Sequence, residues 1–246
     1  MFPVDGIIIP GFIRMIEKHL RFNLVYALVF ILVLISGYKQ WPAIVYIAKP
    51  CITLLLLIFL YLSTGLKGRF QKRLFAGLIF ALAGDTLISI HALHSAGFIW
   101  GLIALIICHL FYIGAFYLDF RSAQELDKKG AKIAIISSAV AFSGFYFYLR
   151  PHVGPLKLPV LFCIFMMALL VMMAAFRRQR VNALSFKLVL TGVFFFVLTD
   201  AILADVWLNS TSSTFSLLMT AGFMIAQYLI VMGGAERKLV HTQTPD

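Results

Sequence analysis

The sequence predicts an all-α protein that crosses a membrane several times. Of its 246 residues, 62% are hydrophobic and only 13% are charged, and the mean hydropathy is +0.97. A soluble domain carries roughly 45–50% apolar and about 25% charged residues. Because the apolar excess is spread along the whole chain, we interpret residues 1–246 as a single integral membrane domain. The alternating segments of about ten residues that are typical of membrane β-barrels are absent.

Eight apolar stretches are long enough to cross a bilayer, whose hydrocarbon core of about 30 Å needs roughly 20 helical residues. The predicted helices cover residues 22–38, 43–62, 74–90, 96–117, 131–149, 156–176, 186–207 and 214–233. Basic residues precede the first stretch, but no small-residue cleavage site follows it, so we expect a retained helix and not a signal peptide. Residues 1–20 are expected to add a short helix at the membrane interface.

The basic residues are distributed unevenly over the connecting segments. If the N-terminus lies inside, the outer loops hold only Lys39, Arg150 and Lys157, and nearly all the other Lys and Arg residues lie in inner segments. By the positive-inside rule, both termini are then cytoplasmic. We therefore attribute the net charge of +11 to topology and lipid headgroups and predict no nucleic-acid partner. The inner basic side chains are expected to be solvated. The short loops favour a bacterial inner membrane over an organelle.

The third and seventh predicted helices share a spacing pattern. The matching positions are Lys72, Gly77 and Asp85, and again Lys187, Gly192 and Asp200. Both helices run outward in the predicted topology, so the pattern is consistent with two four-helix units related by a parallel repeat.

Three charged residues fall well inside predicted helices: Asp85, Asp200 and Lys49. At a rise of 1.5 Å per residue, Asp85 lies roughly 5 Å outward of the membrane midplane, and Asp200 and Lys49 lie at nearly the same height. A charge at the centre of a helix costs at least ~2.5–3.5 kcal/mol, so each needs a partner, a water-filled cavity or a role. Three charges at one depth on three helices predict one site.

Other polar residues are expected near this site. His109 and Tyr112 share a helix face because they are three residues apart, and Gln227 lies at similar depth. His109 and Tyr112 also have a purely structural interpretation, as hydrogen-bonding and packing residues. Two alternatives remain for Lys49. It contacts a substrate anion, or it is structural, capping carbonyls freed by Pro50 or neutralising one aspartate.

Two neighbouring carboxyls in an apolar site tend to share a proton near neutral pH, which supplies one acid and one base. Asp85 and Asp200 therefore suit hydrolysis of an acid-labile bond, and equally suit a proton-coupled transporter. The chain has no G-x-S-x-G nucleophile motif, no H-E-x-x-H zinc motif and no phosphate-binding glycine loop. Cys51, Cys108 and Cys163 lack metal-ligand spacing, so no metal or other cofactor is predicted.

Four short segments resemble signatures of the lysoplasmalogenase (YhhN-like) family. In chain order they are Tyr46-Ile-Ala-Lys49-Pro50, Phe80-Ala-Leu-Ala-Gly-Asp85-Thr-Leu-Ile, His109-Leu-Phe-Tyr112 and Phe196-Val-Leu-Thr199-Asp200-Ala-Ile-Leu-Ala. The last departs from the family, which usually has serine where this chain has Thr199, but threonine keeps the hydroxyl. Order, spacing and the eight-helix length fit over nearly the whole chain.

The resemblance implies hydrolysis of the vinyl ether bond of a lysoplasmalogen, giving a fatty aldehyde and a glycerophospho-ethanolamine or -choline. It implies an acid/base pair of Asp85 and Asp200, with individual roles unassigned, assisted by His109. The supporting or substrate-binding candidates are Lys49, Tyr46, Tyr112, Gln227 and Thr199. The implied partner is a lysophospholipid within the membrane. The oligomeric state is not predicted.

Three other function classes remain open from the residues alone. A proton-coupled transporter of an amphiphile would use the same aspartates. A lipid-binding or scaffolding protein would tolerate asparagine at both positions. An intramembrane aspartyl protease also pairs two aspartates, but its usual Tyr-Asp and Gly-x-Gly-Asp patterns are absent from this chain.

Overall fold

The structure, a computed structural model, describes residues 8–90, 95–124, 126–154, 157–209 and 213–240. Within these ranges the chain forms nine helices and no strand longer than an isolated pairing of Val181 with Leu239. The helices are α1 (Ile8–Lys18), α2 (Leu20–Tyr38), α3 (Pro42–Thr64), α4 (Arg69–Ile90), α5 (Ser95–Arg121), α6 (Lys128–Leu149), α7 (Lys157–Ala175), α8 (Ala183–Asn209) and α9 (Ser213–Ala235).

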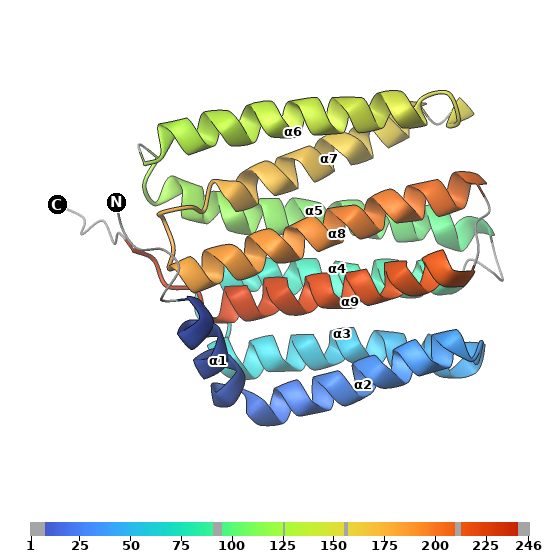
Figure 1. Ribbon diagram of the computed structural model, residues 1–246, viewed down its shortest axis with the longest axis horizontal. Helices are drawn as coiled ribbons and strands as arrows, with labels where there is room; N and C mark the ends of the chain where they lie inside the picture. Colours follow the sequence, from blue (N-terminus) through green and yellow to red (C-terminus); the bar gives the residue numbers. More distant parts are fainter. Residues whose placement is uncertain (1–7, 91–94, 125, 155–156, 210–212, 241–246) are drawn as a thin grey trace.

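The eight helices α2 to α9 lie side by side with their axes nearly aligned, and the short α1 crosses them at one end (Figure 1). The C-terminal end of α9 lies at that same end. A single large apolar cluster fills the centre, with its fully buried side chains contributed mainly by α3, α4, α5, α8 and α9. The all-α prediction is therefore confirmed.

Local sequence explains where several helices begin and end. Pro42 occupies the first turn of α3, where its missing N–H has no intrahelical partner in any case. Gly65 ends α3 in the left-handed conformation that glycine adopts without strain. The side chain of Asp127 accepts a hydrogen bond from the backbone N–H of Gly130 and so caps the start of α6.

Two helix pairs form the tightest packing in the bundle, α4 with α5 and α8 with α9. A Cβ atom at Gly77 of α4 would lie 2.5 Å from the ring of Tyr112 on α5. A Cβ atom at Gly192 of α8 would lie 2.9 Å from the carbonyl oxygen of Ala226 on α9. Small residues at such contacts let two membrane helices approach closely. Helix α3 also packs on α9, and α7 packs on α5.

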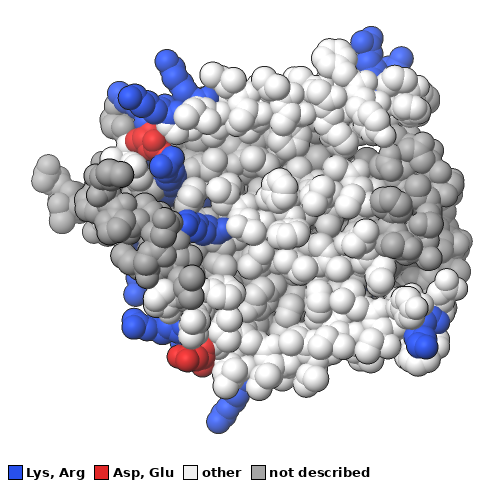
Figure 2. All heavy atoms as spheres, viewed as in Figure 1, with Lys and Arg blue, Asp and Glu red and all other residues white. Residues whose placement is uncertain are grey.

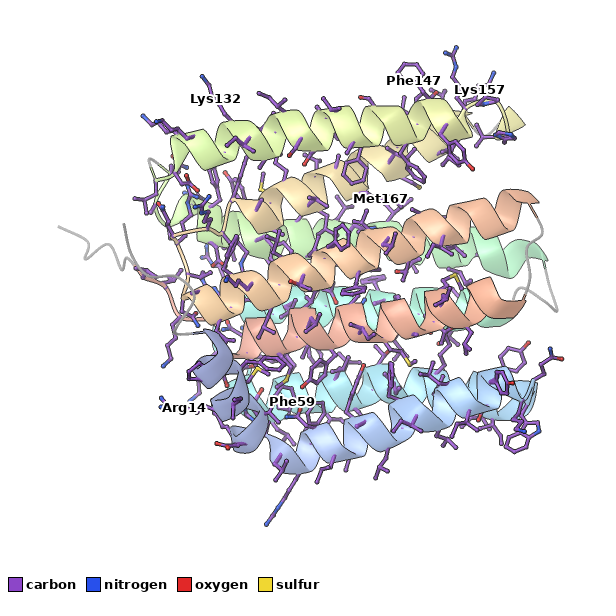
Figure 3. All side chains as sticks on the ribbon, viewed as in Figure 1. Arg14, Phe59, Lys132, Phe147, Lys157 and Met167 are labelled. Atoms are coloured by element: carbon purple, nitrogen blue, oxygen red, sulfur yellow. The ribbon has the colours of Figure 1, made fainter. Side chains whose placement is uncertain are left out.

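Charged side chains gather at the ends of the bundle and leave an uncharged band between them (Figure 2). Arg14 and Lys132 lie at the end where α1 crosses, and Lys157 lies at the opposite end (Figure 3). Many large apolar side chains on the sides of the bundle are exposed, among them Leu28 and Val140. This is the surface of an integral multi-pass membrane protein.

Six of the described helices are long and apolar enough to span a membrane: α2, α3, α5, α6, α8 and α9. The apolar part of α7 is shorter, residues Val160–Ala175, and α4 carries three basic residues at its start as well as Asp85. The eight predicted helices correspond one for one to α2–α9, and the helix expected within residues 1–20 is α1. The predicted bounds differ from the observed ones most at the start of α4 and the end of α5, because both helices continue past their apolar residues.

Candidate active site

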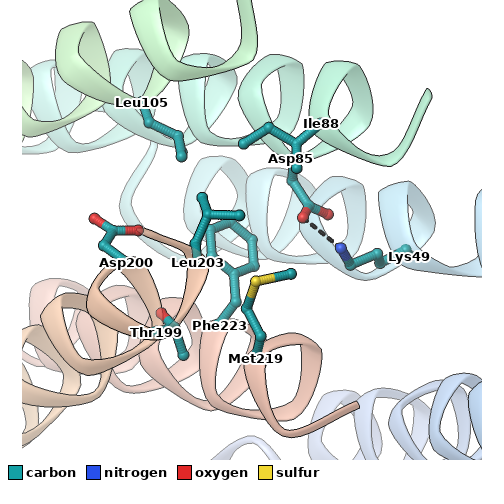
Figure 4. A pocket seen from close by; sticks show the side chains of 9 residues that line it. All are labelled: Lys49, Asp85, Ile88, Leu105, Thr199, Asp200, Leu203, Met219 and Phe223. Atoms are coloured by element: carbon teal, nitrogen blue, oxygen red, sulfur yellow. Dashed lines mark hydrogen bonds and ion pairs between the residues drawn. The ribbon is translucent and has the colours of Figure 1, made fainter. Parts of the chain in front are cut away.

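A small pocket lies between helices α3, α4, α5, α8 and α9 (Figure 4). Its lining residues are Lys49, Asp85, Ile88, Leu105, Thr199, Asp200, Leu203, Met219 and Phe223. The three charges predicted to share one depth therefore line one pocket, and most of the remaining wall is apolar. Asp85 and Asp200 lie on different sides of it (Figure 4).

Asp85 forms a buried ion pair with Lys49. The Nζ atom of Lys49 donates to Oδ1 of Asp85 at 2.6 Å, and the two residues are only 5% and 7% exposed. Lys49 stands directly before Pro50, inside α3. Of the alternatives left open by the sequence, neutralisation of an aspartate is the one that this contact supports. Breaking such a pair would leave an uncompensated buried charge.

Asp200 has a different neighbour, the imidazole of His109 on α5. Oδ2 of Asp200 lies 3.0 Å from Nε2 of His109, and both side chains are buried. The direction of approach does not fit a hydrogen bond, so these two atoms and Nδ1 of His109 have no hydrogen-bond partner among the described residues. The imidazole stacks on the ring of Phe196 with centroids 5.0 Å apart. The ring is thus held in place by packing. His109 does not itself line the pocket, but it lies directly against Asp200, which does.

The remaining predicted residues lie at different distances from the pocket. Thr199 lines it, and its hydroxyl donates to the carbonyl oxygen of Phe196 one turn earlier. Tyr112 and Gln227 are fully buried and bonded to each other, Tyr112 Oη to Gln227 Oε1 at 2.6 Å, outside the lining set. Tyr46 does not line the pocket. It lies on α3 and is 37% exposed.

The pocket combines groups that can donate, accept and hold a proton. The ammonium group of Lys49 balances the charge of Asp85, whereas Asp200 lies against an imidazole, a side chain that can donate or accept a proton. Within the described ranges no three His, Cys, Asp or Glu side chains are grouped as metal ligands. The arrangement is therefore suited to acid/base chemistry on a bond placed between the two carboxyls.

A second buried polar cluster, which the sequence did not reveal, lies near the basic end of the bundle. Asp119 on α5 accepts from Nε of Arg177 at 2.8 Å and from Nε of Arg237 at 2.6 Å. Arg177 also donates to Oγ of Ser185 at 2.9 Å. The guanidinium groups of both arginines lie over the ring of Phe70. This cluster ties α5 to the segments that flank α8 and α9.

The expectation that the inner basic side chains are solvated is wrong for two of them. Arg177 and Arg180 are 0% and 1% exposed. Burial lowers the pKa of Arg177 from its ordinary value, and the neighbouring Asp119 partly offsets this effect. Arg180 donates to the backbone carbonyl oxygens of Ala123 at 2.8 Å and Leu126 at 2.7 Å, which closes the connection between α5 and α6. The sequence does carry one sign of this cluster, the acidic Asp119 near the end of an apolar helix.

The fold and the pocket define a class: a multi-pass helical membrane protein with two buried carboxyls at one site. The family model described as the YhhN family matches residues 44–234, and the chain belongs to this family. The matched range contains every residue that lines the pocket.

Two curated proteins are similar to this chain at lower identity. They are lysoplasmalogenases of Mycobacterium bovis and Mycobacterium tuberculosis, each 26% identical over 170 residues. The match covers 65% of this chain and 63% of each relative, so it spans somewhat less than two thirds of their length. No solved structure matches the chain significantly.

Proposed function

We propose that this protein is a lysoplasmalogenase, which hydrolyses the vinyl ether bond of a lysoplasmalogen by acid/base catalysis with Asp85 and Asp200. The observation that carries the proposal is that both aspartates line one buried pocket in a member of the YhhN family. The name of the mycobacterial relatives supports the same reaction class and a lysophospholipid substrate.

The chemistry needs one acid and one base. The acid adds a proton to the vinyl carbon remote from the ether oxygen, which leaves an oxocarbenium ion. Water attacks the carbon next to the oxygen, and the base takes the proton that this water loses. The resulting hemiacetal collapses to the aldehyde and the glycerol hydroxyl, which returns the acid and base to their starting forms. A carboxylate near the cation stabilises it electrostatically, and none of these steps requires a metal ion.

The apolar wall of the pocket suits an inserted alkenyl chain. Ile88, Leu105, Leu203, Met219 and Phe223 provide apolar surface next to the two carboxyls. A lysolipid lying in the membrane would present its chain to such a wall while its headgroup stays near the interface.

We further propose that all eight long helices span a membrane, with both termini cytoplasmic and in two parallel four-helix repeats. The clustering of Arg14 and Lys132 at one end, with α1 and the end of α9, supports this orientation by the positive-inside rule. A bacterial inner membrane is the proposed location, since the connections between the helices are short.

The test is aldehyde release from a vinyl-ether lysophospholipid by the purified protein in detergent. Asp85→Asn and Asp200→Asn should each lower the rate by ~10²-fold or more, the usual contribution of a positioned acid or base. Asp127→Asn is the matched control, because asparagine can still cap α6 and this position is far from the pocket in sequence.

Two results would contradict the proposal. Activity that survives in either pocket variant would exclude the acid/base pair. A folded parent protein that releases no aldehyde would exclude the hydrolase, and flux of the lipid into liposomes without bond cleavage would then identify a proton-coupled transporter.

A further inference from the structure

The two aspartates occupy equivalent positions in the proposed repeat. Asp85 and Asp200 are 115 residues apart, and the same offset relates Gly77, at the contact of α4 with α5, to Gly192, at the contact of α8 with α9. It also relates Tyr112 to Gln227, which are hydrogen-bonded to each other at 2.6 Å. In a two-fold arrangement, a residue on the axis contacts its own equivalent.

Most of the contacts between the long helices follow the same two-fold relation, although α9 also packs on α2 and α4 without an equivalent contact of α5. The offset pairs α2 with α6, α3 with α7, α4 with α8 and α5 with α9. Accordingly α2 packs on α3 as α6 packs on α7, α3 packs on α4 as α7 packs on α8, and α3 packs on α9 as α7 packs on α5. Equivalent surroundings for the two carboxyls would follow if the sequences of the two halves were the same.

The partners of the two carboxyls break this equivalence. Asp85 is paired with Lys49, and the residue 115 positions after Lys49 is the apolar Ile164. Asp200 lies against His109, and the residue 115 positions after His109 is Met224. One carboxyl therefore has an ammonium group at 2.6 Å. The other has a neighbour that is charged only when it is protonated.

We propose that this difference divides the catalytic roles: Lys49 holds Asp85 as the carboxylate that serves as base, and Asp200, beside His109, is the acid that protonates the vinyl ether. Lys49 and His109 are positioning residues, which act through the carboxyls. The inference rests on the proposed function and assigns roles within the same site.

The steps balance with these assignments. Asp200 gives its proton to the remote vinyl carbon and becomes a carboxylate next to His109. Asp85 stabilises the oxocarbenium ion and then takes a proton from the attacking water. When the hemiacetal collapses, its hydroxyl proton returns to Asp200 and the glycerol oxygen receives the proton held by Asp85. A fixed carboxylate at Asp85 is useful because the cation forms in a largely apolar pocket.

The first experiment measures the pH dependence of aldehyde release by the parent, Lys49→Met and Lys49→Arg. The acidic limb of the profile reports the base and the alkaline limb reports the acid. Lys49→Met should move the acidic limb to higher pH, because the base loses its adjacent cation. The alkaline limb should stay in place, and Lys49→Arg should restore the parent profile. Lys39→Met, at an exposed lysine, is the matched control.

Two further variants separate this role from a structural one. His109→Gln should move the alkaline limb and leave the acidic limb in place. In an Asp85→Asn background, Lys49→Met should cause no additional loss of rate, because Lys49 acts through Asp85. Movement of the alkaline limb by Lys49→Met would overturn the assignment. So would a Lys49→Met variant with lower thermal stability and an unchanged profile.

The second experiment does not depend on activity. Infrared spectra of the resting protein at neutral pH should contain the carbonyl stretch of a protonated carboxylic acid. Asp200→Asn should remove this band and Asp85→Asn should keep it; the reverse result would overturn the assignment. If the band behaves as expected but the parent releases no aldehyde, the proposed reaction fails while the charge assignment stands.

Discussion

The buried cluster around Asp119 offers the sharpest test of what holds the bundle together at its basic end. Asp119 and Arg177 are both 0% exposed, and Asp119 is the acceptor for Arg177 and Arg237. Asp119→Asn removes the negative charge at nearly constant volume. Arg177 would then keep a buried positive charge without compensation, because its other hydrogen bonds within the described residues go to the neutral Ser185.

The expected loss of stability is large. Removing one partner of a buried ion pair costs about 3–5 kcal/mol. Asparagine keeps one acceptor oxygen, and Arg237 is 14% exposed at its side chain and can reach water, so we expect the lower end, about 3 kcal/mol. For a chain of this size, that corresponds to a fall in Tm of roughly 6–12 °C.

Thermal unfolding in detergent can be followed with a thiol-reactive dye in a Cys51→Ala, Cys163→Ala background, since these two thiols are only partly buried. The remaining Cys108 is fully buried and reacts only after the bundle opens. Glu17→Gln, at an exposed carboxyl of α1, is the matched control, and it should unfold at the temperature of the parent. Replacing the pair by Asp119→Leu with Arg177→Met should recover part of the loss, because apolar residues of similar volume often substitute for buried ion pairs. An Asp119→Asn variant with a Tm within about 2 °C of the parent would refute the reasoning.

Two further predictions concern the packing of single elements. Burial raises the pKa of Glu236, but hydrogen bonds from the basic side chains at the end of α1 outweigh burial and lower the pKa overall. The contribution of Glu236 to docking of α1 is therefore complete above the ordinary carboxyl value and is lost as the pH falls through the lowered pKa. A Met15→Cys variant, at a buried position of α1, should accordingly be labelled faster by maleimide after Glu236→Gln. It should also be labelled faster at acid pH when each rate is divided by that of the unfolded protein at the same pH, because the thiolate fraction itself falls with pH. Equal normalised rates would refute this. Gly192→Ala should destabilise the protein by about 1–3 kcal/mol, since its Cβ would meet the backbone of α9 at 2.9 Å. Gly144→Ala, with open space around it, should stabilise α6 slightly through helix propensity, and Tm values for the two variants compare them directly.

Much of the helical framework could be predicted because most of the long helices contain a long apolar run. The cost of a charge in a membrane also singled out Asp85, Asp200 and Lys49, and they line one pocket. Depth along a helix can be read from residue counts, because every residue adds the same rise. That is why residues on three different helices could be placed at one height before any contact was known.

Rotation about the helix axis could not be predicted in the same way. Helix α3 is apolar on all sides, so no amphipathic pattern tells which face is buried. Tyr46 is exposed although it stands one turn before the buried Lys49. The contact of Asp119 with Arg177 was missed for a related reason. It joins residues 58 positions apart, and an arginine in a loop gives no sign of being buried until the partner helix is in place.

The placement of α6 determines which amino-acid substitutions this helix tolerates. Helix α6 packs chiefly on α7, contributes nothing to the described wall of the pocket, and buries only 11% of its apolar span within the bundle. Nearly its whole circumference is therefore solvated by lipid tails, which require apolar side chains but no particular shapes. Substitutions among Ile, Val, Leu and Phe on this helix should be almost neutral, and a spectroscopic label attached there would report on the surrounding lipid without disturbing the pocket.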